Sequence, residues 1–213
     1  MIKPNRHHYL QQGLLFLCGL TIVIGSPAIS NSGRSALSQG QRKRISKGIV
    51  IRNIEGDPVK IKEMKVGAIG RRFEEDFDDS DDWLKKLSLE IKNDWSKPIV
   101  YLSVALSFPE TESSGQRMTF TLPLGNRPGS SAKRENLSFS PGDKLVINMA
   151  DYHEWIMQFL HPRHSVSQIN KAEIQIQFAV FGDQTAWGGG EFFVPDPYNP
   201  DRYNNVGTNP PKP

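Results

Sequence analysis

The sequence predicts an all-β fold in which two sheets pack against each other, and three observations support this prediction. Apolar residues recur at every second position in several short runs, which is typical of strands buried on one face. Turn-forming residues separate these runs at short intervals. Only one segment shows helical spacing of its apolar residues. The clearest strand candidates are two runs within residues 87–108, LSLEIKNDWSKPIVYLSVALSF, on either side of an Asn-Asp-Trp-Ser-Lys-Pro turn.

Residues 1–28 have the layout of a secretory signal peptide. Lys3 and Arg6 supply positive charge, an apolar segment runs from Leu14 to Ile24, and the small residue Ala28 precedes the expected cleavage point. The apolar segment is shorter than the roughly 20 residues that span a bilayer, so cleavage is favoured over a retained anchor. The protein is therefore expected to be secreted or periplasmic, with a membrane as partner only through an uncleaved leader.

Cysteine content and charge limit the chemistry and the partners. The only cysteine, Cys18, lies in the leader after large apolar residues, which disfavours a lipid-anchored precursor. The remaining chain must rely on its apolar core rather than on disulfides. The formal net charge is +3, and Lys3 and Arg6 of the leader contribute to it. A mature chain so close to neutral argues against nucleic acid as a partner.

The chain downstream of the leader divides into three parts. Residues 29–47 are polar, rich in Ser and Gly, and contain Arg42-Lys43-Arg44, so they predict a flexible basic linker. Docking of this linker onto anionic lipid or polysaccharide is an alternative interpretation. A single β domain is expected over residues 48–194, since one domain of this length can bury a sufficient core. Residues 195–213 predict a Pro/Asn-rich tail that is extended and mobile.

The strands of the domain follow from alternation and turn signals. The first two, beginning at Ile49 and Val59 on either side of a Glu55–Pro58 turn, are expected at the edge of one sheet. The strand over residues 172–180 alternates without a break and is expected to be central and to continue through Trp187. Further runs begin or centre at Met118, Leu137, Leu145 and Glu191, and Gly188–Gly190 predict a hinge or bulge before the last strand.

One short helix is expected between Asp151 and Leu160. Asp151 is expected to cap its N-terminus, with Glu154 completing a variant of the capping box, and Pro162 ends it. Seven or so short strands with one crossover helix fit an immunoglobulin-like antiparallel β-sandwich. The expected packing stripe of the helix consists of Tyr152, Trp155, Ile156 and Phe159.

Three segments resemble uncharacterised secreted bacterial proteins with an immunoglobulin-like β-sandwich. They are the turn Lys92–Ile99 (KNDWSKPI), the segment Phe181–Trp187 (FGDQTAW) and the tail segment Asp196–Tyr203 (DPYNPDRY). Similar asparagine–serine-lysine-proline-isoleucine and phenylalanine-aspartate-glycine-threonine-tryptophan segments recur in those proteins. This chain departs from them at Trp95 and Gln184. The resemblance implies a fold and export, and it implies no reaction.

Two groups of side chains invite a metal hypothesis. The acidic run Glu74–Asp82 offers the oxygen ligands that calcium prefers. Counted from Asp76, however, the positions that a helix-loop-helix calcium site needs as Gly and Glu are Asp81 and Leu87. A solvated acidic loop is therefore expected, and the following Trp83 and Leu84 are expected to enter the core.

The second group contains His153, His161 and His164. These histidines lack the convergent spacing of a zinc site, since no cysteine accompanies them and no His-Glu-x-x-His pattern is present. They are expected to be surface residues. We therefore predict neither a metal nor a cofactor.

No catalytic constellation is recognisable, because the sequence has no Gly-x-Ser-x-Gly elbow and no thiol outside the leader. The main hypothesis is a non-catalytic interaction or structural module of the bacterial envelope. Its partner would be an unknown protein or an envelope polysaccharide.

Two alternatives remain open. Carbohydrate binding would use exposed rings at Trp95, Trp187, Tyr198 and Tyr203, although core packing is an equally simple role for them. A hydrolase would use a pair of carboxylates, for which Glu173 and Glu191 are the candidates. The less favoured of the two is the hydrolase.

Overall fold

The protein is described here by a computed structural model that covers residues 45–130, 134–162, 164 and 166–210. The expected signal peptide at residues 1–28 and the linker up to residue 44 lie outside the described residues. Within the described part of the chain, no helix is long and apolar enough to cross a membrane.

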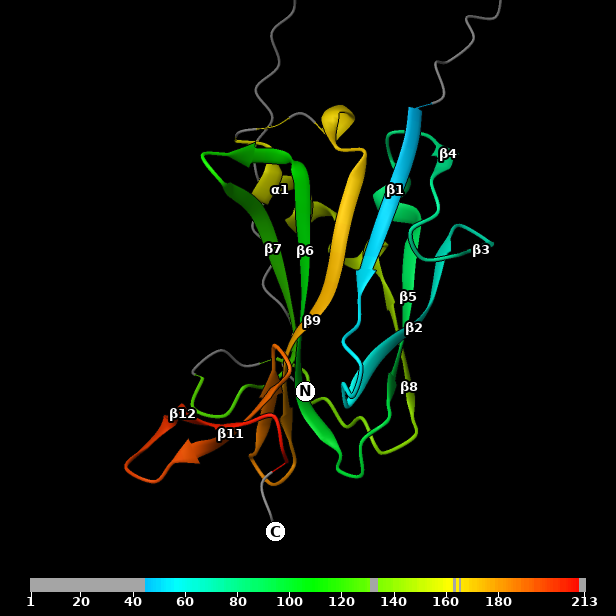
Figure 1. The fold of residues 1–213 in the computed structure, drawn as a ribbon. Helices are drawn as coiled ribbons and strands as arrows, with labels where there is room; N and C mark the ends of the chain where they lie inside the picture. The colour runs from blue at the N-terminus through cyan, green and yellow to red at the C-terminus, as the bar shows by residue number, and fades with distance from the viewer. Residues whose placement is uncertain (1–44, 131–133, 163, 165, 211–213) are drawn as a thin grey trace, which may run out of the picture. The chain divides into compact units, whose positions relative to one another are not determined.

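Twelve described strands form two sheets (Figure 1), so the all-β prediction is confirmed. The neighbouring strands are antiparallel except for β1 and β9, which run parallel. The prediction of a fully antiparallel sandwich is therefore wrong at this pair. The eight-stranded sheet contains β1 (Ile45–Arg52), β4 (Phe77–Asp79), β6 (Ile99–Ser113), β7 (Gln116–Gly125), β9 (Lys171–Phe181), β10 (Ala186–Gly188), β11 (Glu191–Asp196) and β12 (Asn199–Gly207). The four-stranded sheet contains β2 (Val59–Val66), β3 (Ile69–Arg71), β5 (Leu87–Asn93) and β8 (Lys144–Asn148).

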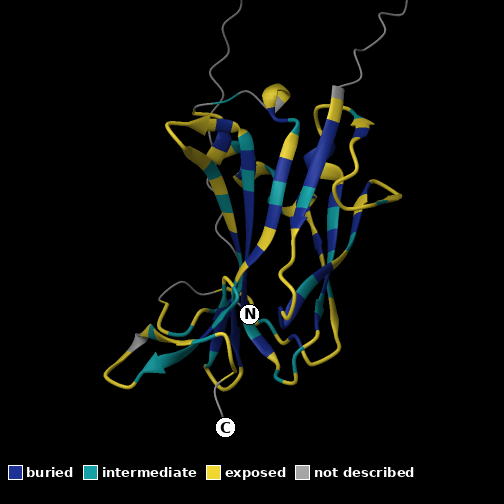
Figure 2. Ribbon diagram, in the orientation of Figure 1, coloured by how far each residue is buried: buried dark blue, intermediate teal, exposed yellow. Residues whose placement is uncertain are grey.

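The two sheets bury their inner faces in one hydrophobic core. Buried residues concentrate along the strands, whereas exposed residues follow the turns and loops (Figure 2). Alternation explains this distribution, because every second side chain of a strand points to the same face. The core includes Ile49 and Ile174 of the larger sheet and Leu89 and Ile91 of the smaller one.

The two alternating runs of residues 87–108 lie in different sheets. Residues 94–98 carry the chain from β5 in the smaller sheet to β6 in the larger one. Leu102 and Val104 face the core. Val100 does not, because a register shift between Ile99 and Tyr101 turns its side chain toward a second, smaller cluster.

Strand β9 is the centre of the larger sheet (Figure 1). Strand β6 pairs with one edge of β9 over nearly the whole length of β9. The other edge is shared, since β1 pairs with Lys171–Gln175 and β10 pairs with Ala179–Val180. Residues 176–178 of β9 therefore lie between the ends of two different partner strands.

The first two strands differ from the expectation of a shared sheet edge. Strand β1 lies between β9 and β4, whereas β2 lies in the other sheet between β3 and β5. Strand β1 also begins at Ile45, three residues before the expected start at Gly48. The sequence could not show this, because Ile45–Lys47 have the polar composition of the preceding linker.

The central strand does not continue through Trp187 as expected. The chain reverses at residues 182–185, where Gln184 adopts a positive φ of 67°, and returns antiparallel to β9 as β10. The next reversal uses Gly189 and Gly190, whose φ values of 61° and 85° suit a two-residue hairpin turn. The last described strand, β12, pairs with β11, so residues 199–207 of the expected tail belong to the larger sheet.

Helix α1 (His153–Leu160) follows the 3₁₀ helix η2 (Met149–Tyr152) where the chain crosses from β8 to β9. Two further 3₁₀ helices are η1 (Trp83–Lys86) and η3 (Val166–Gln168). The predicted Asp151 cap is wrong, because Asp151 lies within η2 and α1 has no side-chain cap. The predicted stripe is only partly right, since Ile156 and Leu160 are buried but Trp155 is 59% exposed.

Two glycines with similar backbone conformations provide a test of the packing between β6 and the chain beside it. Gly125 (φ 78°) and Gly115 (φ 76°) both adopt left-handed conformations, but a Cβ on Gly125 would overlap the Val100 carbonyl oxygen, whereas one on Gly115 meets open space. We expect Gly125→Ala to reduce the free energy of unfolding by about 3 kcal/mol or more. Gly115→Ala should cost only about 1 kcal/mol of backbone strain. Equal losses in urea denaturation would contradict this packing.

Candidate functional site

A cleft of about 500 Å³ opens where the partner of β9 changes from β1 to β10. The end of β1 and the turn after it form one wall, β9 forms the floor, and the β10 hairpin forms the opposite wall. Its volume falls in the range of small-molecule sites, roughly 300–1,000 Å³. The lining residues are Val50–Ile54, Asp57, Glu74, Gln175–Gln177, Trp187 and Gly189.

Asp57 is the most unusual lining residue. Its residue is only 6% exposed, and its Oδ2 accepts a hydrogen bond of 2.6 Å from the backbone N–H of Ile54. Its Oδ1 is buried and has no hydrogen-bond partner. Burial raises the pKa of the Asp57 carboxyl, against the lowering effects of the Ile54 hydrogen bond and the Lys60 charge. Asp57 thus brings to the lining a carboxylate with one buried oxygen, Oδ1, that the folded chain leaves unsatisfied.

The turn that carries Asp57 is fixed by its own hydrogen bonds. Both ends of the Asn53 side-chain amide bond to the backbone of Ile61 in β2, at 2.9 and 3.1 Å. The N–H of Asp57 donates to the Ile54 carbonyl at 3.1 Å, which closes the turn. These contacts hold the turn against β2 and fix the wall of the cleft that carries Asp57.

The charges at the cleft leave an excess of negative groups. Arg52 forms an ion pair with Glu173 in which the Arg52 Nη2 lies 2.9 Å from Oε2. Glu173 also contacts Arg117 at 3.0 Å, so both arginines and this glutamate form one exposed network. Asp57 and Glu74 also line the cleft, and neither carboxylate forms an ion pair with another residue of the lining. The cleft therefore favours a positively charged or hydrogen-bond-donating group.

The four aromatic residues expected to bind carbohydrate do not share one exposed face. Trp187 is 2% exposed and belongs to the core, and it also lines the cleft. The Trp95 ring packs 5.3 Å from the ring of Phe192. Tyr203 packs against Phe178, with ring centroids 5.7 Å apart, and fixes β12 to the sheet. Of the four, Tyr198 alone is fully open to solvent, at 96% exposure.

The first two segments that carry the family resemblance pack against each other. The Lys97 ammonium lies 2.5 Å from Asp183, and the N–H of Gly182 donates to the Pro98 carbonyl at 2.8 Å. Burial alone would raise the pKa of Asp183, but hydrogen bonds from Lys97 and Thr185 outweigh it and lower the pKa. These contacts hold the β5–β6 connection to the β9–β10 turn. They give the segments a structural role.

The buried Asn93 side chain organises the same connection. Its Nδ2 donates to the carbonyls of Lys97 and Phe139, at 3.0 and 2.9 Å, and its Oδ1 accepts from the N–H of Trp95. A single amide group therefore satisfies three backbone groups where the chain changes sheets.

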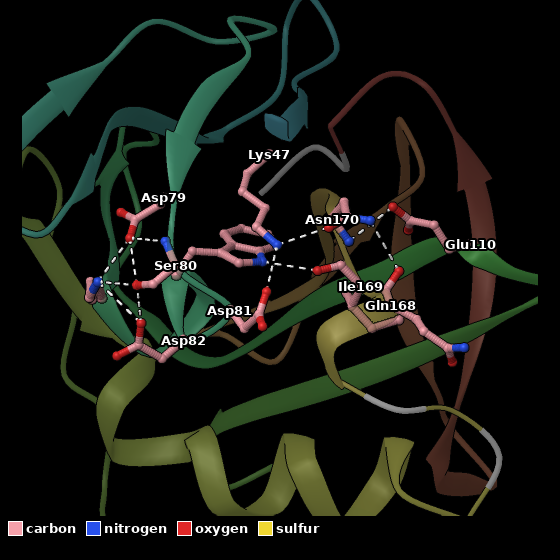
Figure 3. Close-up of polar contacts among 11 residues, drawn as sticks. Lys47, Asp79, Ser80, Asp81, Asp82, Glu110, Gln168, Ile169 and Asn170 are labelled. Atoms are coloured by element: carbon pink, nitrogen blue, oxygen red, sulfur yellow. Dashed lines mark hydrogen bonds and ion pairs between the residues drawn. The ribbon is translucent and has the colours of Figure 1, made fainter. Parts of the chain in front are cut away.

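A second polar cluster surrounds Lys47 (Figure 3). Its side chain is completely buried, and Nζ donates to Asn170 Oδ1 at 2.8 Å and lies 3.4 Å from Asp81. Beside it, the indole N–H of Trp83 donates to the Ile169 carbonyl at 3.1 Å. Lys47 was expected to end a solvated linker. Instead it anchors the first described strand.

Three carboxylates of the acidic run, those of Asp79, Asp81 and Asp82, are engaged by lysines. Lys86 lies 2.8 Å from Asp79 and 3.2 Å from Asp82. Burial opposes the shift at Asp79, but hydrogen bonds from Lys86 and Ser80 lower its pKa, and hydrogen bonds from Ser80 and Lys86 lower the pKa of Asp82. The run is also not a continuous loop, since Phe77–Asp79 form β4. Trp83 and Leu84 enter the core as predicted.

The described residues form no site that supports either metal hypothesis. No group of three or more His, Cys, Asp or Glu side chains among them is arranged to hold a metal ion. His161 is exposed, and His153 and His164 are half-buried. The two glutamates considered for hydrolysis are each engaged elsewhere, Glu173 with its arginines and Glu191 with Asn205 at 2.5 Å.

Trp155 and Phe159, expected in the packing stripe of the helix, are exposed and lie near two half-buried aromatic rings. We call this group the α1 aromatic row, and it consists of Tyr152, Trp155 and Phe159 with Phe120 of β7. The rings of Tyr152 and Trp155 lie 6.2 Å apart, and those of Phe120 and Phe159 lie 5.7 Å apart. Trp155 and Phe159 follow each other at i and i+4, which places them on one side of the helix. Helical spacing alone could not show that this side faces solvent.

A comparison with known proteins finds no matching family model, no matching curated protein and no matching solved structure. The geometry described above is therefore the basis for assigning a function.

The buried lysine provides a test of the Lys47 cluster. Lys47→Ala removes a buried stem and leaves Asn170 Oδ1 without its donor, so we expect a loss of about 2–4 kcal/mol in the free energy of unfolding. Lys85→Ala, at an exposed position in η1, should change it by less than about 0.5 kcal/mol. Urea denaturation of both variants measures the difference. Similar small effects would show that Lys47 does not anchor β1.

Proposed function

We propose that this protein is a non-catalytic interaction module that acts outside the cytoplasm, and that the cleft between β1 and β10 is its binding site. The observation that carries the proposal is the carboxylate of Asp57, a lining residue of the cleft whose buried Oδ1 has no hydrogen-bond partner. Buried polar groups normally have a hydrogen-bond partner, so a buried group without one in the chain is a candidate for contact with a ligand. A bound ligand supplies that partner.

The composition of the lining supports binding rather than catalysis by a nucleophile and its base. The lining contains carboxylates, amides, an ion-paired arginine and apolar side chains, and it includes no Ser, Thr, Cys, His or Lys. Amide groups orient a ligand through hydrogen bonds but do not exchange protons near neutral pH. The lining therefore offers neither a hydroxyl or thiol nucleophile nor an imidazole base.

The proposal includes an immunoglobulin-like arrangement of the two sheets. Two mostly antiparallel sheets, a chain that crosses between them at residues 94–98, and a helix at the β8–β9 crossover support it. The signal-like residues 1–28 support action outside the cytoplasm.

Export can be tested directly in a bacterial host. We expect the full-length chain to reach the periplasm or medium and to begin at Ile29, because Ala28 precedes the expected cleavage point. Cell fractionation with mass determination of the N-terminus measures both properties. A cytoplasmic protein that retains Met1 would contradict the proposed location.

Binding in the cleft can be tested with a library of small cationic, anionic and neutral fragments. We expect at least one class to shift the NMR signals of the Gln175 and Gln177 side-chain amides and of the Trp187 indole. Gln175→Trp should block the cleft and abolish the shifts, whereas Gln116→Trp, at the exposed start of β7, should leave them unchanged. Absence of shifts with every class would contradict the proposed function.

Carbohydrate binding remains a second candidate because of the α1 aromatic row. Its exposed rings lie among polar side chains of the same helix, including Glu154 and Gln158, and this combination suits the apolar faces and hydroxyls of a sugar. The rings differ from the four that the sequence nominated.

The second candidate predicts retention of the protein on a polysaccharide column. Trp155→Ala should abolish retention without unfolding the domain, because Trp155 is 59% exposed. Phe73→Ala, which removes an exposed ring far along the chain from α1, serves as the control and should be retained like the wild type. Equal retention of the wild type and Trp155→Ala would rule out the α1 aromatic row as a carbohydrate-binding surface.

A further inference from the structure

We infer that the ligand of the cleft is an organic cation, a primary ammonium or guanidinium group on a short apolar stem, and that Asp57 holds its charged end. The inference rests on the proposed function and specifies its ligand.

The unsatisfied hydrogen-bonding group of the lining, Asp57 Oδ1, is an acceptor. Asp57 Oδ1 is buried and unpartnered, while Oδ2 is already engaged by the Ile54 N–H. A ligand group beside Oδ1 must therefore donate a hydrogen bond. Donors that carry a positive charge form the strongest such bonds with a carboxylate. A carboxylate or phosphate ligand would instead leave Oδ1 without a partner.

The surrounding charges favour a cation over a neutral donor. Asp57 and Glu74 both line the cleft, and the positive charge of Arg52 is offset by Glu173. A cationic group in the cleft would offset the charge of these lining carboxylates. Lys60 lies near enough to lower the pKa of Asp57, but it is not part of the lining, so it does not occupy this position.

The walls explain why the cation should carry an apolar stem. The floor and sides include Ile51, Ile176 and Trp187, which are 8%, 7% and 2% exposed. The exposed Gln175 and Gln177 of β9 also belong to the lining and offer amide groups to a polar end of the ligand. Ile54 reaches toward the β10 hairpin, where its Cδ1 would lie 3.9 Å from a Cβ on Gly190.

A bare metal ion fits less well than an organic cation. A hard cation requires several oxygen ligands at once. Within the described residues, no three carboxylate, imidazole or thiol groups converge at any point, the cleft included. One buried carboxylate oxygen next to apolar side chains is the arrangement expected for an ammonium or guanidinium group.

The test compares four probes that share one stem: n-pentylamine, pentylguanidine, n-pentanol and pentanoate, titrated at neutral pH and followed by NMR. We expect the two cations to bind at least tenfold more tightly than pentanol, and pentanoate to bind most weakly. Asp57→Asn should lower the affinity for both cations to that of pentanol and leave pentanol binding unchanged. The matched control, Glu55→Gln, alters an exposed acid of the same turn and should bind like the wild type.

Asparagine retains a carbonyl oxygen for the Ile54 N–H, and thermal unfolding checks that the variant is folded. A second measurement uses the wild type alone. Because burial raises the pKa of Asp57 above 3.8, cation affinity should fall as the pH is lowered through that raised value, while pentanol affinity stays constant. The amine and guanidine probes remain protonated over this range, so only the protein titrates.

The outcomes separate this inference from the proposed function. Equal affinity for pentanol, pentanoate and the cations in the cleft would overturn the cation inference and retain the cleft as a binding site. Cation binding that survives Asp57→Asn and is independent of pH would also overturn it. Failure of all four probes and of the whole fragment library to perturb the cleft would overturn both.

Discussion

One edge of strand β9 is shared by two partners, and the architecture depends on this constraint. Strand β6 occupies the other edge of β9, so β1 and β10 must follow each other along the remaining edge. One partner runs parallel to β9 and the other antiparallel. Ladder pairing is interrupted between them, at residues 176–178. Apolar side chains of Ile176 and Trp187 close the inner side of this interruption, and the cleft occupies what remains.

The elements around the interruption are held by hydrogen bonds to neighbouring parts of the chain. Asn53 ties the β1–β2 turn to β2, and Lys97 ties the β9–β10 turn to the preceding connection. Because both walls are anchored to the rest of the domain, they lose little freedom when a ligand binds, which reduces the entropic cost of binding. Leaving Asp57 Oδ1 unsatisfied costs folding free energy. An unsatisfied group of this kind is expected where a structure is organised for binding.

Local sequence patterns predicted most of the longer strands, because alternation and turn residues act over a few positions, but the run expected at Leu137 forms only an isolated bridge at Phe139. Trp83 and Leu84 were also correctly assigned to the core. The parallel pairing of β1 with β9 was missed, since it joins segments more than a hundred residues apart in a chain that carries no local signal for it. Strand β10 has three residues, too few for a period to be recognised. At the site, Asp57 lies in a correctly predicted turn, but turn aspartates are ordinarily exposed, and only the tertiary structure buries this one.

The division of the β9 edge is open to one direct measurement, a set of inter-strand nuclear Overhauser effects from the isotopically labelled protein. The structure predicts parallel-type contacts between residues 48–52 and 171–175, antiparallel contacts between Trp187 and Ala179, and none that pair either strand with Gln177. Contacts that extend β1 along the whole of β9, or that pair β10 with Gln175, would close the interruption. Such contacts would contradict the origin of the cleft.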